Sequence, residues 1–165
     1  IPAINMVIES GGSTLGNVGT TPNTYHVWSI DNTADAALNF SVRIPEDYSG
    51  GNMTCWVYYS TTKAGVGGDA GGFYCDFDWL SVGDVVSIVS AANTLDDVNL
   101  FTNGTLTKNV LYIRSMGTFS TGIAVNNFLR CRFKRDVTAE ILNLGSANRY
   151  ILQLVGIKLE YTATS

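Results

Sequence analysis

The fold of this chain is decided by the stretch LNFSVRIP, residues 38–45. Its apolar residues, Leu38, Phe40, Val42 and Ile44, alternate with the polar residues between them. Alternation with a period of two predicts an extended strand that buries one face and leaves the other in water. Pro45 is expected to end this strand, because proline has no N–H group to donate to a neighbouring strand.

The same alternation recurs on both sides of this stretch. It predicts further strands over residues 25–30, 53–60, 73–80, 85–89, 109–115, 123–135 and 150–161. Both faces of the strand 53–60 are bulky, so we expect it to be central or to have its outer face covered. Residues 91–108 are rich in Asn and Asp and are predicted to be a loop. Residues 63–72 are rich in Gly and are predicted to be a flexible connection.

About eight strands follow one another with no amphipathic helix of useful length between them. Strands without crossover helices must pair antiparallel. The sequence therefore predicts an all-β fold, an antiparallel two-sheet sandwich with jelly-roll topology. We expect a single sandwich domain over residues 25–165. Residues 1–24, rich in Gly, Thr and Asn, are predicted to form an extended N-terminal arm that orders against a partner.

The amino-acid composition excludes some classes of binding partner. Only 15% of the 165 residues are charged, whereas about a quarter is usual in globular domains. Such a surface is typical of secreted proteins, virion proteins and proteins that pack against copies of themselves. The net charge is −4, so we expect no nucleic-acid or anionic-membrane partner. No apolar run approaches the ~20 residues that a membrane helix needs.

The residues that carry catalysis or bind metals are few. The single histidine, His26, lies in a strand pattern without a nucleophile motif nearby. Asp76 and Asp78 share one strand face and could act as a carboxylate pair or hold a cation, although such spacing also serves solubility. Asp96 and Asp97 lack the remaining ligands of a calcium loop. We therefore predict no enzyme activity, no cofactor and no metal site.

Three cysteines, Cys55, Cys75 and Cys131, cannot all pair within one chain. They are predicted to be small core residues. A disulfide between Cys55 and Cys75 stays open, because both fall on predicted inward faces and only geometry can decide.

Two surface patterns are candidate binding sites. The only basic cluster contains Arg130, Arg132, Lys134 and Arg135. It fits either a solvated face with acidic residues on neighbouring strands or a subunit interface with an acidic partner. Aromatic residues at outward positions, namely Tyr25, Trp56, Tyr58 and Tyr74, fit either a glycan-binding platform or strands that are buried on both sides. We favour the second interpretation of the aromatic residues.

Parts of the chain resemble phage-encoded virion structural proteins. In residues 28–60, an aromatic-Asp segment (WSID, residues 28–31) leads to the alternating strand, a proline, a tyrosine-containing turn and an aromatic strand. The segment RFKRD (residues 132–136) and the ending from Tyr150 to Tyr161 also fit. The resemblance implies a β-sandwich of capsid decoration or head-fibre type that assembles on the virion surface, as a homotrimer bound to the major capsid protein. It implies no catalytic residues.

Two other functions remain open at this stage. One is a carbohydrate-binding or adhesive sandwich, for which the partner would be a glycan and the chain a monomer. The other is a subunit of an extracellular filament, joined to its neighbours by strand exchange into open polymers.

Overall fold

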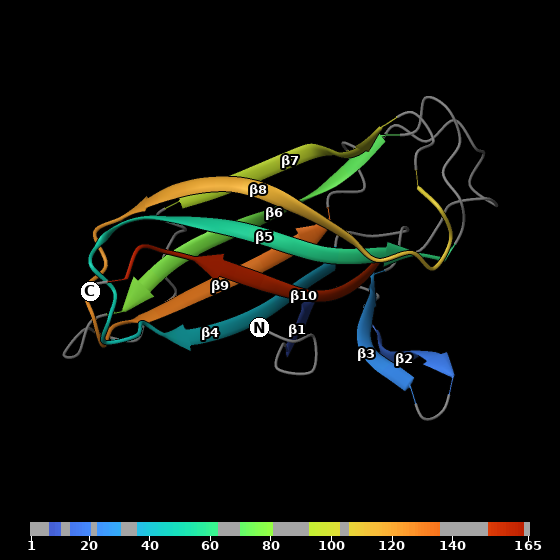
Figure 1. Cartoon of the computed structure of the whole chain (residues 1–165), viewed down its shortest axis with the longest axis horizontal. Coiled ribbons are helices and arrows are strands. Elements are labelled where there is room, and N and C mark those ends of the chain that lie inside the picture. The colour runs from blue at the N-terminus through green and yellow to red at the C-terminus, as the bar shows by residue number, and fades with distance from the viewer. Residues whose placement is uncertain are drawn as a thin grey trace.

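The computed structural model describes residues 7–10, 14–20, 23–30, 36–62, 70–80, 93–102, 106–135 and 152–163. Ten strands make up most of these residues (Figure 1). Their bounds are β1 Val7–Ser10, β2 Thr14–Thr20, β3 Asn23–Ile30, β4 Ala36–Arg43, β5 Gly51–Thr61, β6 Ala70–Leu80, β7 Asn93–Thr102, β8 Tyr112–Thr121, β9 Phe128–Arg135 and β10 Leu152–Glu160. No helix of the described residues is long and apolar enough to cross a membrane.

The strands form two five-stranded sheets in which every neighbouring pair is antiparallel. Sheet one has the order β1-β4-β9-β6-β7, and sheet two has the order β2-β3-β10-β5-β8. The pairs β3–β10, β4–β9, β5–β8 and β6–β7 are nested, like one long hairpin folded across two sheets. This nested order is the one that a jelly roll requires.

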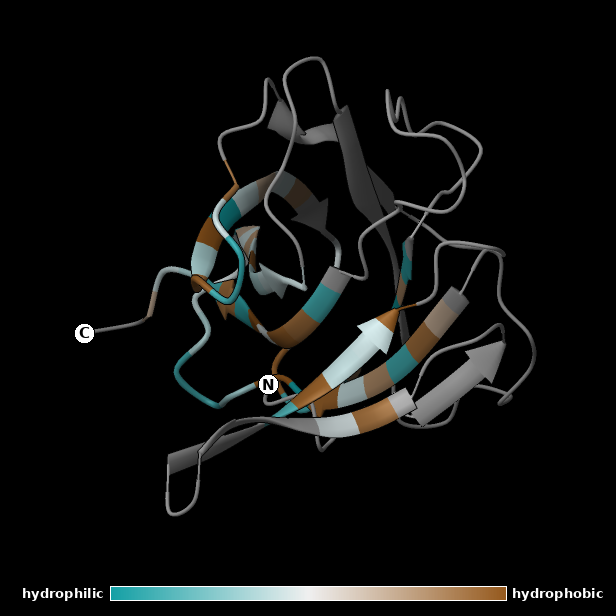
Figure 2. Cartoon of the chain, turned by 90° about the vertical axis from the view of Figure 1, so that its right-hand side faces the viewer, coloured by the Kyte–Doolittle hydropathy of each residue, from teal (hydrophilic) through white to brown (hydrophobic). Residues whose placement is uncertain are grey.

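One apolar core joins the inner faces of the two sheets. From sheet one it takes Leu38, Leu129 and Phe133, and from sheet two it takes Val57 and Leu154, each with no exposed side-chain surface. Figure 2 shows how hydrophobic and hydrophilic residues alternate along the strands that supply this core. The predicted all-β antiparallel two-sheet sandwich is confirmed.

The stretch 38–45 has the pattern of buried and exposed residues that its alternation predicts. In β4, Leu38 and Phe40 are buried while Ser41 and Arg43 are exposed, and the strand ends two residues before Pro45. In β5, the inward residues are buried and the outward ones half-buried, and the strand lies between β10 and β8. The expectation that this strand is not at an edge is therefore confirmed.

Four predicted boundaries are wrong. β6 begins at Ala70, so the last three residues of the predicted Gly-rich connection 63–72 are part of a strand that pairs with β7. Residues 93–102 form β7, where a loop was predicted, because pairing with β6 outweighs the weak strand preference of Asn and Asp. β8 continues to Thr121, past a bulge at which Gly117 has a φ of 122° and the alternation is interrupted. β9 begins only at Phe128, because the residues before it form a turn in which Asn126 has a φ of 67°. The predicted strand 85–89 lies outside the described residues.

The described strands within the first 30 residues pair differently in the two sheets. β1 and β2, which fall within the predicted arm, pair as edge strands with β4 and β3. β4 pairs with β9 over its whole length, whereas β3 pairs with β10 only through Trp28–Ile30. The remainder of β3 and its partner β2 are turned away from β10 as a two-stranded hairpin (Figure 1). The boundary predicted after residue 24 lies inside β3, and the division into arm and domain stays a prediction.

The cysteines agree with the core interpretation as far as they are described. Cys55 and Cys131 are buried thiols in the central cluster and are not in disulfides. The open question of a Cys55–Cys75 bond is thereby answered, because Cys55 carries no disulfide.

Candidate interaction surfaces

The predicted basic cluster lies on the outward face of β9, the central strand of sheet one. Arg130, Arg132 and Lys134 are half-buried, and the residues between them are fully buried. The register sets Arg130 opposite Asp78 and Arg132 opposite Asp76 of β6. On the other side, both arginines face polar residues of β4.

This register favours the first of the two interpretations of the cluster. Opposite charges on directly paired strand positions stabilise a sheet modestly. Each of the two predicted carboxylates stands opposite an arginine, whereas Lys134 stands opposite Tyr74. The fourth member, Arg135, pairs with Ala36 and Phe73 in the register, and its side chain lies outside the described part. The predicted subunit interface at these four residues stays a prediction.

The outward face of sheet two carries an aromatic and charged cluster. The indole Nε1 of Trp56 on β5 donates a hydrogen bond of 2.7 Å to Oε2 of Glu160 on β10. The Lys158 Nζ lies 5.3 Å from the centroid of the same ring and 3.4 Å from Oε2 of Glu160. Lys158 is the direct register partner of Trp56, so the cluster ties β5 to β10.

This cluster changes the interpretation of the predicted glycan platform. A stacking platform needs an open ring face, but Lys158 already lies over the Trp56 ring. Tyr58, two residues along, is half-buried. The side chains of Tyr25 and Tyr74 lie outside the described part, and Tyr74 belongs to β6 in sheet one, whereas Trp56 and Tyr58 belong to β5 in sheet two.

One end of the sandwich is fastened by the turn between β4 and β5. The Ser49 backbone N–H and its hydroxyl both donate to the Thr162 carbonyl, at 3.1 and 2.7 Å. The Tyr48 hydroxyl donates to the Gly51 carbonyl at 2.7 Å, and its ring meets the Tyr161 ring edge to face. The residues after β10 are therefore held against this turn.

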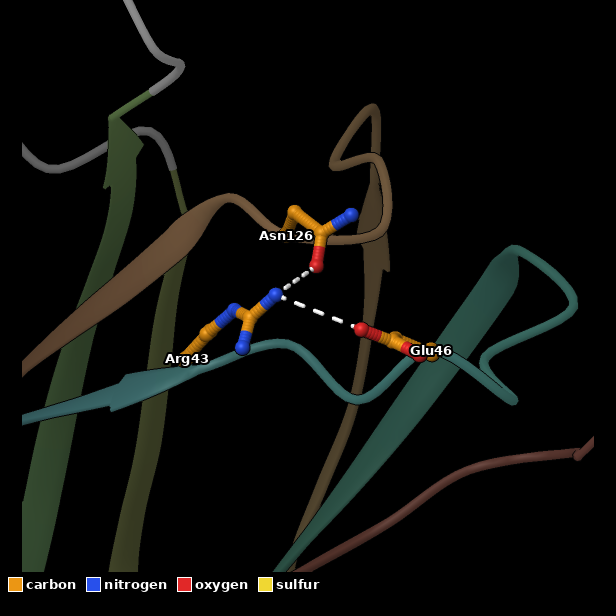
Figure 3. A network of polar contacts seen from close by, with 3 residues as sticks. All are labelled: Arg43, Glu46 and Asn126. Carbon is orange, nitrogen blue, oxygen red and sulfur yellow. Dashed lines mark hydrogen bonds and ion pairs between the residues drawn. The ribbon is translucent and has the colours of Figure 1, made fainter.

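A second set of contacts holds the same end from the side of sheet one (Figure 3). Nη2 of Arg43 donates to Oδ1 of Asn126 and lies 3.4 Å from Oε1 of Glu46. Main-chain hydrogen bonds join Ile44 to the same turn, from Ile44 N to Asn127 O at 2.8 Å and from Asn126 N to Ile44 O at 3.3 Å. Side-chain and main-chain hydrogen bonds thus join the turn that follows β4 to the turn that precedes β9.

The pKa of Tyr161 is perturbed by a neighbouring carboxylate. Its hydroxyl donates a hydrogen bond of 2.9 Å to Oδ1 of Asp47. This bond, then partial desolvation, then the negative charge of Asp47 raise the pKa of Tyr161 above its usual 10.0.

A pocket of about 240 Å³ opens beside the second half of β10. We call it the β10 pocket. Its lining residues are Val42, Ile44, Pro45, Met53, Lys158, Leu159 and Tyr161. They come from the ends of β4 and β10 and the start of β5, and most of the lining is apolar. The pocket therefore lies along the part of β10 that β3 does not accompany.

The comparisons with known proteins are few. No protein-family model matches the sequence, and no curated protein is detectably similar. Among solved structures, the enzymatically active domain of tailspike protein 4 of bacteriophage CBA120 is similar, with a TM-score of 0.49 and 11% sequence identity. The match covers 96% of this chain and 19% of that chain, so this chain spans about a fifth of the tailspike chain. At this score the likeness extends to neither activity nor partner.

The remaining predicted residues do not gather into a site. His26 is exposed on β3, and Asp96 and Asp97 lie in β7 opposite Tyr74 and Phe73. Within the part of the chain that the structure describes, no three His, Cys, Asp or Glu side chains are grouped to hold a metal ion.

Sequence reasoning missed the β10 pocket. The available signal was Gly156, because an isolated glycine in a strand pattern indicates a bulge. The structure has that bulge, since Leu154 pairs with Tyr59 and Gly156 with the adjacent Tyr58, which leaves Val155 as the extra residue. β3 leaves β10 at the same point.

Proposed function

We propose that this chain is a structural subunit of a phage virion, of capsid decoration or head-fibre type. It acts at the particle surface through contacts with copies of itself and with the major capsid protein, and it carries out no reaction. The assignment to capsid decoration or head-fibre type rests on the sequence resemblance in residues 28–60 and 130–161.

The observation that carries the proposal is the difference between the two sheets. In sheet one, the central strand β9 pairs with β4 and with β6 along its whole length, and two of its three outward cations stand opposite carboxylates. Sheet two turns a hairpin away and leaves an apolar pocket beside β10. A sandwich with one projecting hairpin and an apolar pocket has surfaces by which a subunit can join its neighbours.

The glycan-binding alternative has less support. A saccharide site relies on open aromatic faces, and the ring of Trp56 is bound by Lys158 and Glu160. The β10 pocket, at about 240 Å³, is smaller than the usual ~300–1,000 Å³ of small-molecule sites. Its size suits the side chains of a protein segment better than an oligosaccharide.

Immunogold labelling tests the proposal. An antibody raised against the chain is applied to particles and cells from a culture of the organism that carries the gene. We expect gold at repeated positions on the surface of virions. Labelling of cell-surface filaments, with bare virions, would replace the proposal with the extracellular filament.

A further inference from the structure

We propose that two copies of this chain associate by a two-fold contact at the turn that follows β4 and the turn that precedes β9. The surface consists of Arg43, Glu46, Val125, Asn126 and Phe128, and we call it the Phe128 patch. The inference rests on the proposed function, because it names one of the contacts between copies of the chain. Three observations lead to it: exposed apolar side chains, an arginine that is held in position beside them, and opposite charges on the same small surface.

Two large apolar side chains of the patch are exposed to solvent. Phe128 is 50% exposed and Val125 is 40% exposed. Phe128 is the first residue of β9 and lies on the outward face of sheet one, because successive strand residues alternate and its neighbour Leu129 is completely buried. Aromatic residues are enriched in the buried centres of protein interfaces, where they contribute much of the affinity. Phe128 is therefore suited to burial by a partner.

Arg43 is the direct neighbour of Phe128 on this face. The register pairs the two residues across β4 and β9, and directly paired strand residues have Cβ atoms about 4.5–5.5 Å apart. The Arg43 side chain is 57% exposed. Its Nη2 donates to Oδ1 of Asn126 and lies 3.4 Å from Oε1 of Glu46 (Figure 3). These two contacts restrict the guanidinium group while more than half of the side chain stays in solvent.

The backbone of the turn before β9 supports this arrangement. Asn126 has a φ of 67°, in the left-handed region that residues other than glycine seldom adopt, and such conformations are concentrated at functional sites. Main-chain hydrogen bonds fix the turn to the end of β4, from Ile44 N to Asn127 O at 2.8 Å and from Asn126 N to Ile44 O at 3.3 Å. A surface that is ordered before binding loses less conformational entropy when it docks.

The charges of the patch match a second copy of the same patch. Arg43 and Glu46 carry opposite charges, so the patch has no net charge. A two-fold axis sets residue i of one copy against residue j of the other, and j against i. Arg43 of each copy then pairs with Glu46 of the other, and the two Phe128 rings are buried beside these pairs. A uniformly acidic partner would be repelled by Glu46 and a uniformly basic one by Arg43, whereas a second copy satisfies both.

The ion pair within one chain does not compete strongly with the contact between copies. Its two side chains are 57% and 80% exposed, and exposed ion pairs contribute little to stability because water and salt screen them. Attraction between the same charges is stronger in a contact from which water is excluded. A two-fold contact joins copies in pairs, so it is separate from the three-fold contact that the sequence resemblance implies.

Charge reversal tests the two-fold contact, with masses measured by light scattering. Arg43→Glu places two acidic residues on the patch, and Glu46→Arg places two basic ones. We expect the unmodified chain to have an even multiple of the chain mass of 17.8 kDa. Each variant alone should have half the mass of the unmodified assembly, because like charges meet across the axis. An equimolar mixture of the two variants should recover the full mass, which also shows that both variants are folded.

A second pair of variants tests the apolar part of the patch. Phe128→Ser removes the exposed ring and should halve the mass of the assembly. Ile113→Ser is the matched control, because Ile113 is 52% exposed but lies on β8 in the other sheet, and it should leave the mass unchanged. Neither side chain belongs to the buried core, so both circular dichroism spectra should match that of the unmodified chain.

Every other outcome overturns the inference. The contact is wrong if the unmodified chain is a monomer at every concentration, if the single charge variants keep the full mass, or if their mixture does not recover it. Equal effects of Phe128→Ser and Ile113→Ser also count against the patch. Gold on virions together with a chain that does not pair would retain the proposed function while removing the two-fold contact, so the two failures are distinguishable.

Discussion

The strand pairs β4–β9 and β3–β10 hold matching positions in the two sheets and differ in extent. β4 meets β9 at eight consecutive residues, from Ala36 to Arg43. β3 meets β10 at three, after which a bulge in β10 and the departure of β3 coincide. The nested strand order is the same for both pairs, so topology does not set how far two strands stay together. A local irregularity in β10 sets it.

The largest expected effect is in the fully paired sheet. Phe133 on β9 is completely buried, so Phe133→Ala should lower the free energy of unfolding by about 3–5 kcal/mol. The adjacent Lys134→Ala, on the outward face of the same strand, should lower it by less than about 1 kcal/mol. Urea denaturation of both variants measures the contrast. Equal losses would mean that β9 does not separate an interior from a surface.

Hydrogen exchange should sharpen the contrast between the two pairs. We expect the amides of residues 23–26 to exchange at least ~100-fold faster than those of β4, because the described strands pair them only with residues 17–20, whereas β4 pairs with β9 over its whole length. Equal exchange rates in the two segments would show that the hairpin is held as firmly as β4.

The opposite side of β10 should be held by the Trp56 cluster. Trp56→Ala removes the hydrogen bond to Glu160 and the contact with Lys158, so we expect a loss of about 1–3 kcal/mol in unfolding free energy. Thr54→Ala on the same strand face, which removes a hydrogen bond to the hydroxyl of Thr118, is the control and should cost less. A smaller loss for Trp56→Ala than for the control would show that the cluster does not fasten β5 to β10.

The charged row on sheet one should contribute little. Arg132→Gln removes one charge opposite Asp76, and opposite charges at paired strand positions contribute about 0.2–1 kcal/mol. We expect a shift in unfolding free energy within that range, which shrinks further in high salt. If the substitution instead changed the mass of an oligomer in solution, the basic cluster would be a subunit interface.

The smallest effect on stability is expected where the turn between β4 and β5 contacts the residues after β10, and this effect depends on pH. The pKa of Tyr161 is higher in the folded chain than in the unfolded chain, so the neutral hydroxyl is favoured on folding. This contribution is fully present below pH 10 and is lost as the pH rises through the folded value. Asp47→Asn should lower the pKa of Tyr161 toward 10.0, as measured by tyrosinate absorbance with Tyr161→Phe as the reference. An unchanged titration would mean that Asp47 is not the cause.

The strand faces were predictable because burial acts on each strand separately. Alternation along 38–44 and 129–134 indicated which residues point inward, and the structure buries Leu38, Phe40, Leu129 and Phe133 accordingly. Prediction from this alternation failed where the pattern is interrupted. β7 is rich in Asn and Asp, and it is a strand because its partner β6 supplies hydrogen bonds that no local propensity reveals.

The candidate site was less predictable from the sequence, because the residues that form it are far apart in the chain and meet only in the folded structure. The arm, the bulge-forming Gly156 and the end of β4 are each visible in the sequence. The apolar pocket at the ends of β4 and β10 is not, because residues 42–45 and 158–161 are brought together only when the sheets pack.

By itself the sequence determined the fold class, the inward faces of the clearly alternating strands and the low, acidic charge, since these follow from residue type and a period of two. Only the tertiary structure decided where β3 leaves β10, which residues line the pocket and which carboxylates stand opposite Arg130 and Arg132. The physical reason is that burial is read along one strand, whereas register and strand departure depend on pairing between strands that are far apart in the chain.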